Sequence, residues 1–497
     1  MRRLRRLVGI GAPDASLTAV SGMVAVTELV DRLNMIKLLD AAIGPIKARD
    51  RGHSGGQLLV GLTAAHLAGE DFLVGLDRQR GDVAGQALAP VSGLSSTTAA
   101  GLARRFTEGQ WRAVETGIGD VHSAVLAVLS PQRVAALCET VTIDLDTTDV
   151  EVYGRKKRGM AYNYLGQRCG RPHVATWAQT CTALAADLMA GDEDPRGHAA
   201  DLLGRALAAL PAAARAGRVL LRADAGYFAG ALARAALLAG VEFAIGAKRI
   251  APLWRILAGV AEGDWIDAID MDGAQVAVAA YGPDWWPSAT RLLIRRVHLA
   301  PDQVSADPRS RRRRTLHPDQ RALPIAELAA AAAIYGYSFI VTNLDVSTPA
   351  KATEVEHWYR HRTAIENVFR DAKHGAALRH LPSDTPGQHG VDVGCAARGQ
   401  HRRLAPPTHR HPRTPRHTDR SRRPRRPSHD HHPAPQTDPG TRPPGPPRRR
   451  ARPTTTTRPP PTPDDPRPSP RPPRNTLTRP HGPDNPEPAH PRRHSGT

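Results

Sequence analysis

Acidic residues stand at the ends of two strand-like segments, and one glutamate lies inside a strongly basic segment. The first strand-like segment contains IDLDTT, with Asp144 and Asp146, and the second contains VLLRAD, which ends at Asp224. Glu366 lies in the basic segment HWYRHRTAIENVFRDAKHG, residues 357–375. Carboxylates from separate elements repel one another unless a cation lies between them, and their hard oxygens select Mg²⁺ or Mn²⁺. Two such ions can activate a water or a 3′-OH and stabilise the leaving oxygen in phosphoryl transfer.

The basic segment around Glu366 has the pattern of an amphipathic helix. Its apolar residues recur at helical spacing, so we expect a single helix over residues 357–375. On that helix Arg362 and Glu366 are four residues apart and share a face, and Lys373 lies two turns further on. An exposed ion pair, which contributes less than about 1 kcal/mol, would explain the same spacing without any catalytic role.

The acidic positions depend on a mixed fold in which strands and helices alternate. Residues 1–135 show helical periodicity, separated by Gly, Ser and Pro. Beyond residue 140 the strand-like segments are VTIDLDTT, RVLLRAD, FAIGAKR and YSFIVTNLD. Helix-like segments between them predict a mixed α/β core. Because Asp144 and Asp146 are two residues apart on one strand, their side chains point to the same face.

The composition indicates a polyanionic partner. The 497 residues carry a formal net charge of +20, with a pI near 10.7, and such an excess is typical of nucleic-acid-binding proteins. The four cysteines form no C-x-x-C pair, so neither a zinc site nor a disulfide framework is expected. There is no run of about 18 apolar residues and no signal-peptide pattern. We therefore expect a cytoplasmic, nucleoid-associated protein with no membrane partner.

The last part of the sequence has a different composition. Residues 383–497 contain 23 arginines, nine acidic residues and no Ile, Phe, Tyr, Trp, Met or Lys, so we expect this tail to be disordered. Written in GC-rich codons and read one nucleotide later, residues 387–407 give an apolar segment with helical spacing. This favours a frameshift near residues 383–387, either a defect or a programmed slippage. The lost segment would leave Val368 and Phe369 exposed, and we expect this copy to be poorly active or inactive.

The motifs resemble those of a known enzyme family. Tyr359, Arg362, Glu366 and Lys373 match Y-(2)-R-(3)-E-(6)-K, a signature of many insertion-sequence DDE transposases. IDLDTT is similar to the strand that carries the first Asp of that family, and LLRADAGYF is similar to the strand that carries the second. The stretch VEVYGRKKRGMAYNYLG most resembles the insertion-sequence family numbered 1380. The resemblance covers roughly residues 10–382.

The resemblance implies an RNase H-like catalytic core. Asp146, Asp224 and Glu366 would form the catalytic triad and hold two Mg²⁺ or Mn²⁺ ions, and Asp144 would support them. In the family an Asp directly before Thr is the first triad member, which favours Asp146 over Asp144. The family fills the gap of 142 residues between Asp224 and Glu366 with a mostly β insertion. The three remaining signature residues would orient Glu366 and contact DNA phosphates; they are Tyr359, Arg362 and Lys373.

Five regions are expected along the chain. They are a helical, DNA-end-binding domain (1–135), the first part of the core (136–251), the β-rich insertion (252–325), the rest of the core (326–382) and the tail (383–497). The insertion contains the loop SRRRRT, in which Arg312 and Arg313 would contact DNA phosphates, or would simply be solvated. Trp285 and Trp286 also lie in it, and core packing is a simpler role for them than stacking on a flipped base.

The expected function is therefore metal-dependent DNA transposition. The protein would nick DNA at the terminal inverted repeats of its element and join the freed 3′-OH to target DNA, as a homodimer on DNA. Two other functions fit parts of the sequence. A truncated DNA-binding regulator would need only the N-terminal helices, and an RNase H-like nuclease unrelated to transposition would cleave without preference for particular ends.

Overall fold

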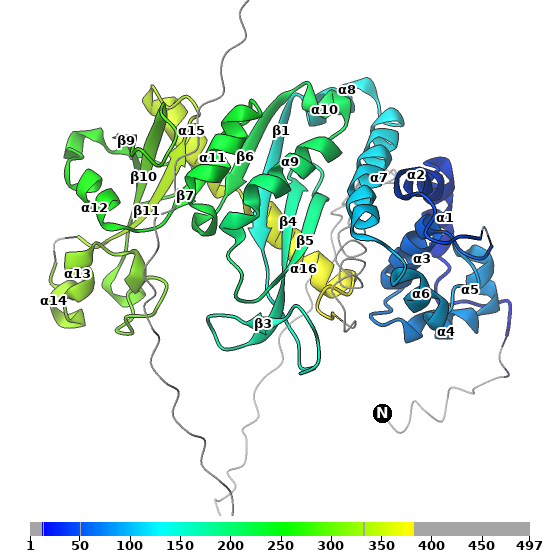
Figure 1. The fold of residues 1–497 in the computed structure, drawn as a ribbon. Coiled ribbons are helices and arrows are strands. Elements are labelled where there is room, and N and C mark those ends of the chain that lie inside the picture. The colour runs from blue at the N-terminus through cyan, green and yellow to red at the C-terminus, as the bar shows by residue number, and fades with distance from the viewer. Residues whose placement is uncertain (1–11, 13, 50, 332, 382–497) are drawn as a thin grey trace, which may run out of the picture. The chain divides into compact units, whose positions relative to one another are not determined.

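The computed structural model describes residues 12, 14–49, 51–331 and 333–381. Within this range the helices and strands form a mixed fold, as the sequence predicts (Figure 1). The predicted disordered tail and the frameshift segment lie outside the described residues. Among those residues, none of the helices has the length and apolar character that a membrane crossing requires.

The N-terminal part is helical. Ser54 and Thr107 form capping boxes at the starts of α3 and α7, which fixes where these two helices begin. Apolar residues such as Leu39, Leu58 and Ile118 form their own buried cluster. The helices are α1 (Met23–Arg32), α2 (Met35–Ile43), α3 (Gly55–Leu67), α4 (Val74–Arg80), α5 (Val83–Leu88), α6 (Ser96–Ala103), α7 (Glu108–Ala127) and α8 (Pro131–Cys138).

One large sheet follows, in the order β2-β4-β1-β6-β7-β11-β10-β9-β8, and β3 and β5 also pair with β4. Strands β1, β6 and β7 are parallel to one another, and the other pairs are antiparallel. The strands are β1 (Thr140–Thr147), β2 (Val150–Glu151), β3 (Ala161–Tyr162), β4 (Arg168–Trp177), β5 (Thr182–Ala190), β6 (Arg218–Ala223), β7 (Glu242–Ala247), β8 (Ile266–Asp267), β9 (Ala274–Tyr281), β10 (Thr290–His298) and β11 (Tyr335–Thr342).

Helices cover both faces of this sheet. On one face α9 (Ala199–Ala209) and α11 (Gly230–Leu238) pack on the odd-numbered residues of β1, such as Ile143. On the other face lie α15 (Pro349–Arg360) and α16 (Thr363–Gly375), drawn in yellow in Figure 1. Because side chains alternate along a strand, Asp144 and Asp146 point toward α15 and α16. The remaining helices are α10 (Ala212–Arg215), α12 (Ala251–Ala258), α13 (Pro318–Ala322) and α14 (Ile325–Ala329).

The stretch expected to be a β-rich insertion is part of the same sheet. Residues 252–325 supply β8, β9 and β10, and β10 pairs with β11 along eight residues. Since β11 pairs in turn with β7, the hydrogen bonding runs without interruption from the acidic strands to β8. The stretch is strand-rich as predicted, and its strands extend the core sheet rather than forming a separate one.

Two expectations about the segment around Glu366 are wrong. The chain does not form one helix over residues 357–375, because α15 ends at Arg360 and α16 begins at Thr363. Val368 and Phe369 are not exposed. Both are buried, and Phe369 packs in a cluster with Val150, Val174 and Leu378. The physical argument that the apolar side of this helix lies uncovered, which was one reason to expect a defective copy, therefore does not hold.

Candidate active site

The parallel pairing of β1 with β6 places two acids at one edge of the sheet. Leu145 of β1 is in register with Ala223 of β6, so Asp146 and Asp224 follow directly at the carboxyl ends of neighbouring strands. The Oδ1 atom of Asp146 accepts from its neighbour Thr147 N at 2.8 Å. Asp224 Oδ1 accepts from the amide of Gly226 at 2.8 Å, which turns the chain into a short 3₁₀ helix. In open sheets with parallel strands, ligands bind at this edge.

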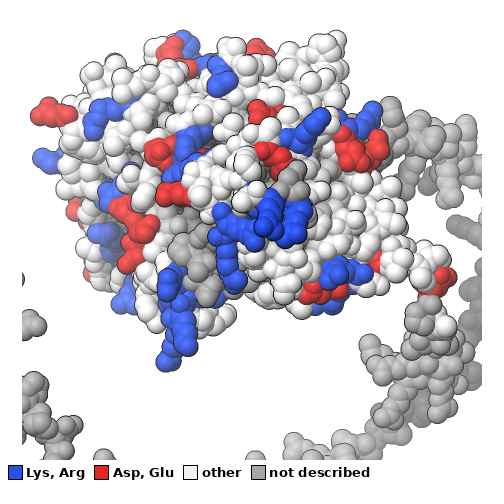
Figure 2. Space-filling model, turned by 45° about the vertical axis from the view of Figure 1, so that its right-hand side comes forward, with Lys and Arg blue, Asp and Glu red and all other residues white. Residues whose placement is uncertain are grey.

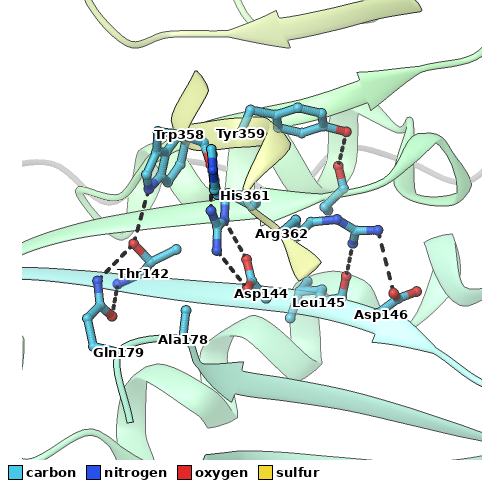
Figure 3. Close-up of polar contacts among 12 residues, drawn as sticks. Thr142, Asp144, Leu145, Asp146, Ala178, Gln179, Trp358, Tyr359, His361 and Arg362 are labelled. Carbon is cyan, nitrogen blue, oxygen red and sulfur yellow. Dashed lines mark hydrogen bonds and ion pairs between the residues drawn. The ribbon is translucent and has the colours of Figure 1, made fainter. Parts of the chain in front are cut away.

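The break between α15 and α16 brings Arg362 to the same edge. Arg362 precedes the first residue of α16, and its guanidinium points back to β1 (Figure 3). It donates to the carbonyl of Leu145 at 3.0 Å and lies 3.5 Å from Asp146 Oδ2. The prediction that Arg362 and Glu366 share one face of a helix is therefore wrong. Arg362 precedes α16 and binds β1, while Glu366 lies in the first turn of α16.

Burial and charged neighbours determine the protonation of Asp146. Burial, together with the negative charges of Asp224 and Glu366, raises the pKa of Asp146 to about 6, while Arg362 opposes the rise. Burial and the charges of Asp146 and Asp224 likewise raise the pKa of Tyr227. Acids from β1, from the turn after β6 and from α16 thus each affect the charge of this region. In the described part of the chain, no three His, Cys, Asp or Glu side chains are spaced closely enough to ligate one ion as they stand.

Asp144 has a different partner. The Arg222 guanidinium holds both its carboxylate oxygens, at 2.7 and 2.9 Å, and both side chains are buried. Arg222 also donates to the carbonyl of Trp358 at 2.6 Å and lies over its indole ring. Burial raises the pKa of Asp144, and the ion pair with Arg222 opposes that rise. Through these contacts Arg222 joins β1, β6 and α15 next to Asp146.

Tyr359 is directed at the second acidic strand. Its hydroxyl donates to the carbonyl of Ala223, the residue before Asp224, at 3.1 Å (Figure 3). Burial raises the pKa of Tyr359 to about 12, so the hydroxyl remains a donor. A Cβ added at Gly246 of β7 would lie 2.5 Å from this hydroxyl, so the close approach requires glycine there. Tyr359 thus positions the chain that carries Asp224.

Comparison with known proteins identifies the family. The sequence pattern of the transposase DDE domain, group 1, matches residues 6–306, which is more than half of the chain. The chain belongs to this family of DDE transposases. The match covers Asp146 and Asp224 and ends before α16, so Glu366 lies beyond it. No curated protein matches.

A solved structure is also similar at a low level. It is the piggyBac transposase in a synaptic complex with hairpin DNA, with 10% sequence identity and a TM-score of 0.34. The alignment covers 78% of this chain and 83% of that chain.

The last signature residue of the transposase makes contacts inside the chain. The Lys373 ammonium donates to Thr148 Oγ1 at 2.6 Å and to the carbonyl of Asp149 at 3.0 Å. Its burial lowers the pKa of Lys373. Lys373 therefore fastens α16 to the segment that leaves β1, and its expected contact with a DNA phosphate stays a prediction.

The residues predicted in the loop of the transposase separate into two groups. Arg312 is exposed, as a phosphate contact requires. Arg313 is buried, and its guanidinium donates to the carbonyls of Arg321 and Leu323, so a DNA contact by Arg313 is not supported. Trp286 is buried against Phe228, which agrees with core packing.

Two residues of the site were not predicted. Arg222 was visible in the sequence as a cation inside an apolar strand, a position that demands a buried partner. His173 of β4 is buried beside Tyr227, with ring centroids 5.5 Å apart, and has no hydrogen-bond partner on either nitrogen among the described residues. No sequence pattern distinguishes His173, because its place depends on the pairing of β4 with β1.

Proposed function

We propose that this transposase nicks DNA at the terminal inverted repeats of its element and joins the freed 3′-OH to target DNA. The observation that carries the proposal is the register of β1 with β6, which places Asp146 and Asp224 side by side, with the charge of Glu366 on α16 also acting on Asp146. Each step is an in-line attack on phosphorus, so one site serves all of them. DNA at the inverted repeats and target DNA are the proposed partners.

The donor set fits a hard divalent cation. Asp146 is largely buried, and the pKa of its carboxyl is raised to about 6 because Arg362 compensates only in part for burial and for the two neighbouring acids. A cation among these oxygens would relieve that repulsion, and carboxylate oxygens select Mg²⁺ or Mn²⁺. We propose Asp146, Asp224 and Glu366 as the ligands of two such ions, which when bound activate the attacking oxygen and stabilise the leaving one.

The surrounding residues of the chain hold this arrangement. Arg362 fixes the end of β1 through the carbonyl of Leu145, and Tyr359 fixes the end of β6 through that of Ala223. The buried pair of Asp144 with Arg222 keeps the two strands in register. A constellation held in this way loses little entropy when substrate binds, which is how positioning lowers a barrier.

Two broader features support the proposal. The acids at the carboxyl ends of adjacent parallel strands are consistent with an RNase H-like core, and the Y-(2)-R-(3)-E-(6)-K residues surround the same edge, as expected for a relative of the insertion-sequence family numbered 1380. Figure 2 shows Lys and Arg side chains gathered in a central patch on one face, which suits a polyanion. We propose that the enzyme acts as a homodimer on DNA.

The test is cleavage of a plasmid that carries the flanking inverted repeats, with Mg²⁺ present. Asp146→Asn, Asp224→Asn and Glu366→Gln should each reduce nicking by more than about a hundredfold, because each removes a charged oxygen ligand. Binding of the repeat DNA should persist in all three variants. Asp302→Asn is the matched control, since this carboxylate is exposed and lies in the 252–325 stretch.

Three results would overturn the assignment. Normal nicking by the Glu366→Gln variant would remove α16 from the chemistry, and equal cleavage of unrelated DNA would favour a general nuclease. Absence of nicking by the unaltered chain under any metal would indicate a regulator that only binds DNA ends. Circular dichroism of each variant verifies that the fold is intact.

A further inference from the structure

The segment VEVYGRKKRGMAYNYLG forms an exposed extension beyond the acidic end of the sheet. It contains β2, a loop and β3, and both strands pair with β4 (Figure 1). Three tyrosines stand out from it, with 86% of Tyr153, 67% of Tyr162 and 88% of Tyr164 accessible to solvent. Large aromatic side chains are usually at least half buried, so three of them exposed on one extension call for a partner.

The extension has an internal framework that presents these rings. The buried Asn163 accepts from the amides of Leu165 and Gln167, and its side-chain nitrogen donates to Asp149. The Arg168 guanidinium donates to the carbonyls of Gly154 and Lys157, which closes the loop. Hydrogen bonds within the extension thus hold it in an ordered conformation in which the tyrosines are exposed.

Cations accompany the tyrosines. Arg155, Lys156 and Arg158 are exposed and make no ion pair with any residue that the structure describes. Lys157, between them, turns inward and donates to the carbonyl of Leu381. Aromatic faces next to unpaired cations are the combination that binds single-stranded nucleic acid, because bases stack on the rings while phosphates meet the charges.

The position of the extension connects it with the candidate active site. Val150 follows Asp146 by four positions along the chain, which corresponds to roughly 13 Å of extended chain. The base of the extension is fixed on the glutamate helix, since Val152 and Met160 belong to the apolar cluster of Ile365 and Phe369. Strand β1 and helix α16 therefore carry Asp146 and Glu366 and also support the extension with its tyrosines.

We propose that this tyrosine–arginine extension, residues 150–168, binds unpaired DNA next to the bond that the transposase cleaves. Tyr153 and Tyr164 stack on bases, and the three exposed cations neutralise phosphates of the same strand. An intact duplex hides its base faces, so the extension selects DNA whose strands have separated at the cleavage site. The inference rests on the proposed function for its location, but it is measured by binding rather than by cleavage.

The experiment measures binding of a single-stranded oligonucleotide, labelled with a fluorescent adenine analogue, and of its duplex, to the full chain carrying Glu366→Gln. Replacing Tyr153 and Tyr164 together by Leu should weaken single-strand binding about tenfold and abolish the stacking-induced quenching, while replacement by Phe should preserve both. Replacing Arg155, Lys156 and Arg158 by Gln should make the salt dependence shallower by roughly 2. A triple variant of the exposed Arg215, Arg255 and Arg291 is the matched control and should retain the original slope.

Unchanged binding and quenching in the Leu double variant would overturn the inference, even if cleavage by the unaltered chain supports the proposed function. Conversely, loss of single-strand binding in the Leu double variant, together with no cleavage by the unaltered chain under any metal, would uphold the extension as a DNA site and reject the proposed function. A change in sedimentation mass without any change in DNA binding would assign the tyrosines to a second copy of this chain and reject the DNA site.

Discussion

At the scale of single residues, the buried pair of Arg222 and Asp144 is the strongest support of the site. Arg222→Met would leave the Asp144 carboxylate buried and unpaired, so we expect a loss of about 3–5 kcal/mol in the free energy of unfolding. Arg218→Met, on the same strand β6, removes an exposed pair with Glu242 and should cost less than about 1 kcal/mol. Urea denaturation of both variants measures the difference. Equal losses in the free energy of unfolding would show that the Arg222–Asp144 pair contributes no more than an exposed ion pair.

His173 gives the fold a specific sensitivity to acid. Burial, together with the charges of His198 and Arg205, lowers the pKa of His173 to about 3. Between its usual value of about 6.5 and 3, the unfolded chain takes up a proton that the folded chain excludes. Stability is therefore full above about pH 6.5 and falls, as pH is lowered, by up to about 1.4 kcal/mol per pH unit.

The measurement compares how stability depends on pH in two variants. His173→Asn should remove this contribution and flatten the dependence between pH 6.5 and 4, the lower limit being about where many carboxylates begin to titrate. His298→Asn, at an exposed position on β10, should leave the dependence unchanged and serves as control. If stability depends on pH in the same way in His173→Asn and in the unaltered chain, the His173 imidazole does not cause the loss of stability in acid.

At the scale of elements, the break between α15 and α16 changes what Arg362 is expected to do. Its guanidinium binds β1, so Arg362→Gln should reduce nicking by about tenfold or more and leave the salt dependence of DNA binding unaltered. Arg312→Gln, in the exposed loop, should do the opposite and make that dependence shallower by roughly 1. Filter binding at several salt concentrations, beside plasmid nicking, distinguishes them. A shallower salt dependence of DNA binding for Arg362→Gln would show instead that this side chain contacts DNA phosphates.

The sequence predicted the helices and strands of the site more accurately than the points at which they end. The acidic strands were readable because an alternating segment rich in β-branched residues contains Asp146 and a short apolar segment ends at Asp224. The break at residues 361–362 was not readable, because apolar spacing continues through it. It follows from Trp358 and Tyr359, which hydrogen-bond to β1 and β6, and from Arg362, which is drawn to Leu145. Contacts between distant segments decided the local structure.

At the scale of the whole molecule, the strand and helix patterns predicted the mixed fold and the motif resemblance predicted the enzyme family, whereas the sheet order required the structure. Residues 252–325 have strand patterns, but nothing in those patterns says that β10 pairs with β11 and so extends the catalytic sheet. For the same reason the ion pair of Arg222 with Asp144 joins residues 78 apart and could not be assigned from spacing.

The long sequence separation between β1 and the residues that contact it, Arg362 and Lys373, also has a consequence for the synthesis of the chain. Arg362 meets Asp146 across 216 residues, and Lys373 meets Thr148 across 225. Since domains fold progressively as they leave the ribosome, both aspartate strands can be in place long before the last acid has been made. On the proposed triad, a nascent chain that has not yet extended α16 carries Asp146 and Asp224 but lacks Glu366. We therefore expect an unfinished chain to be unable to cleave DNA, without any separate inhibitor.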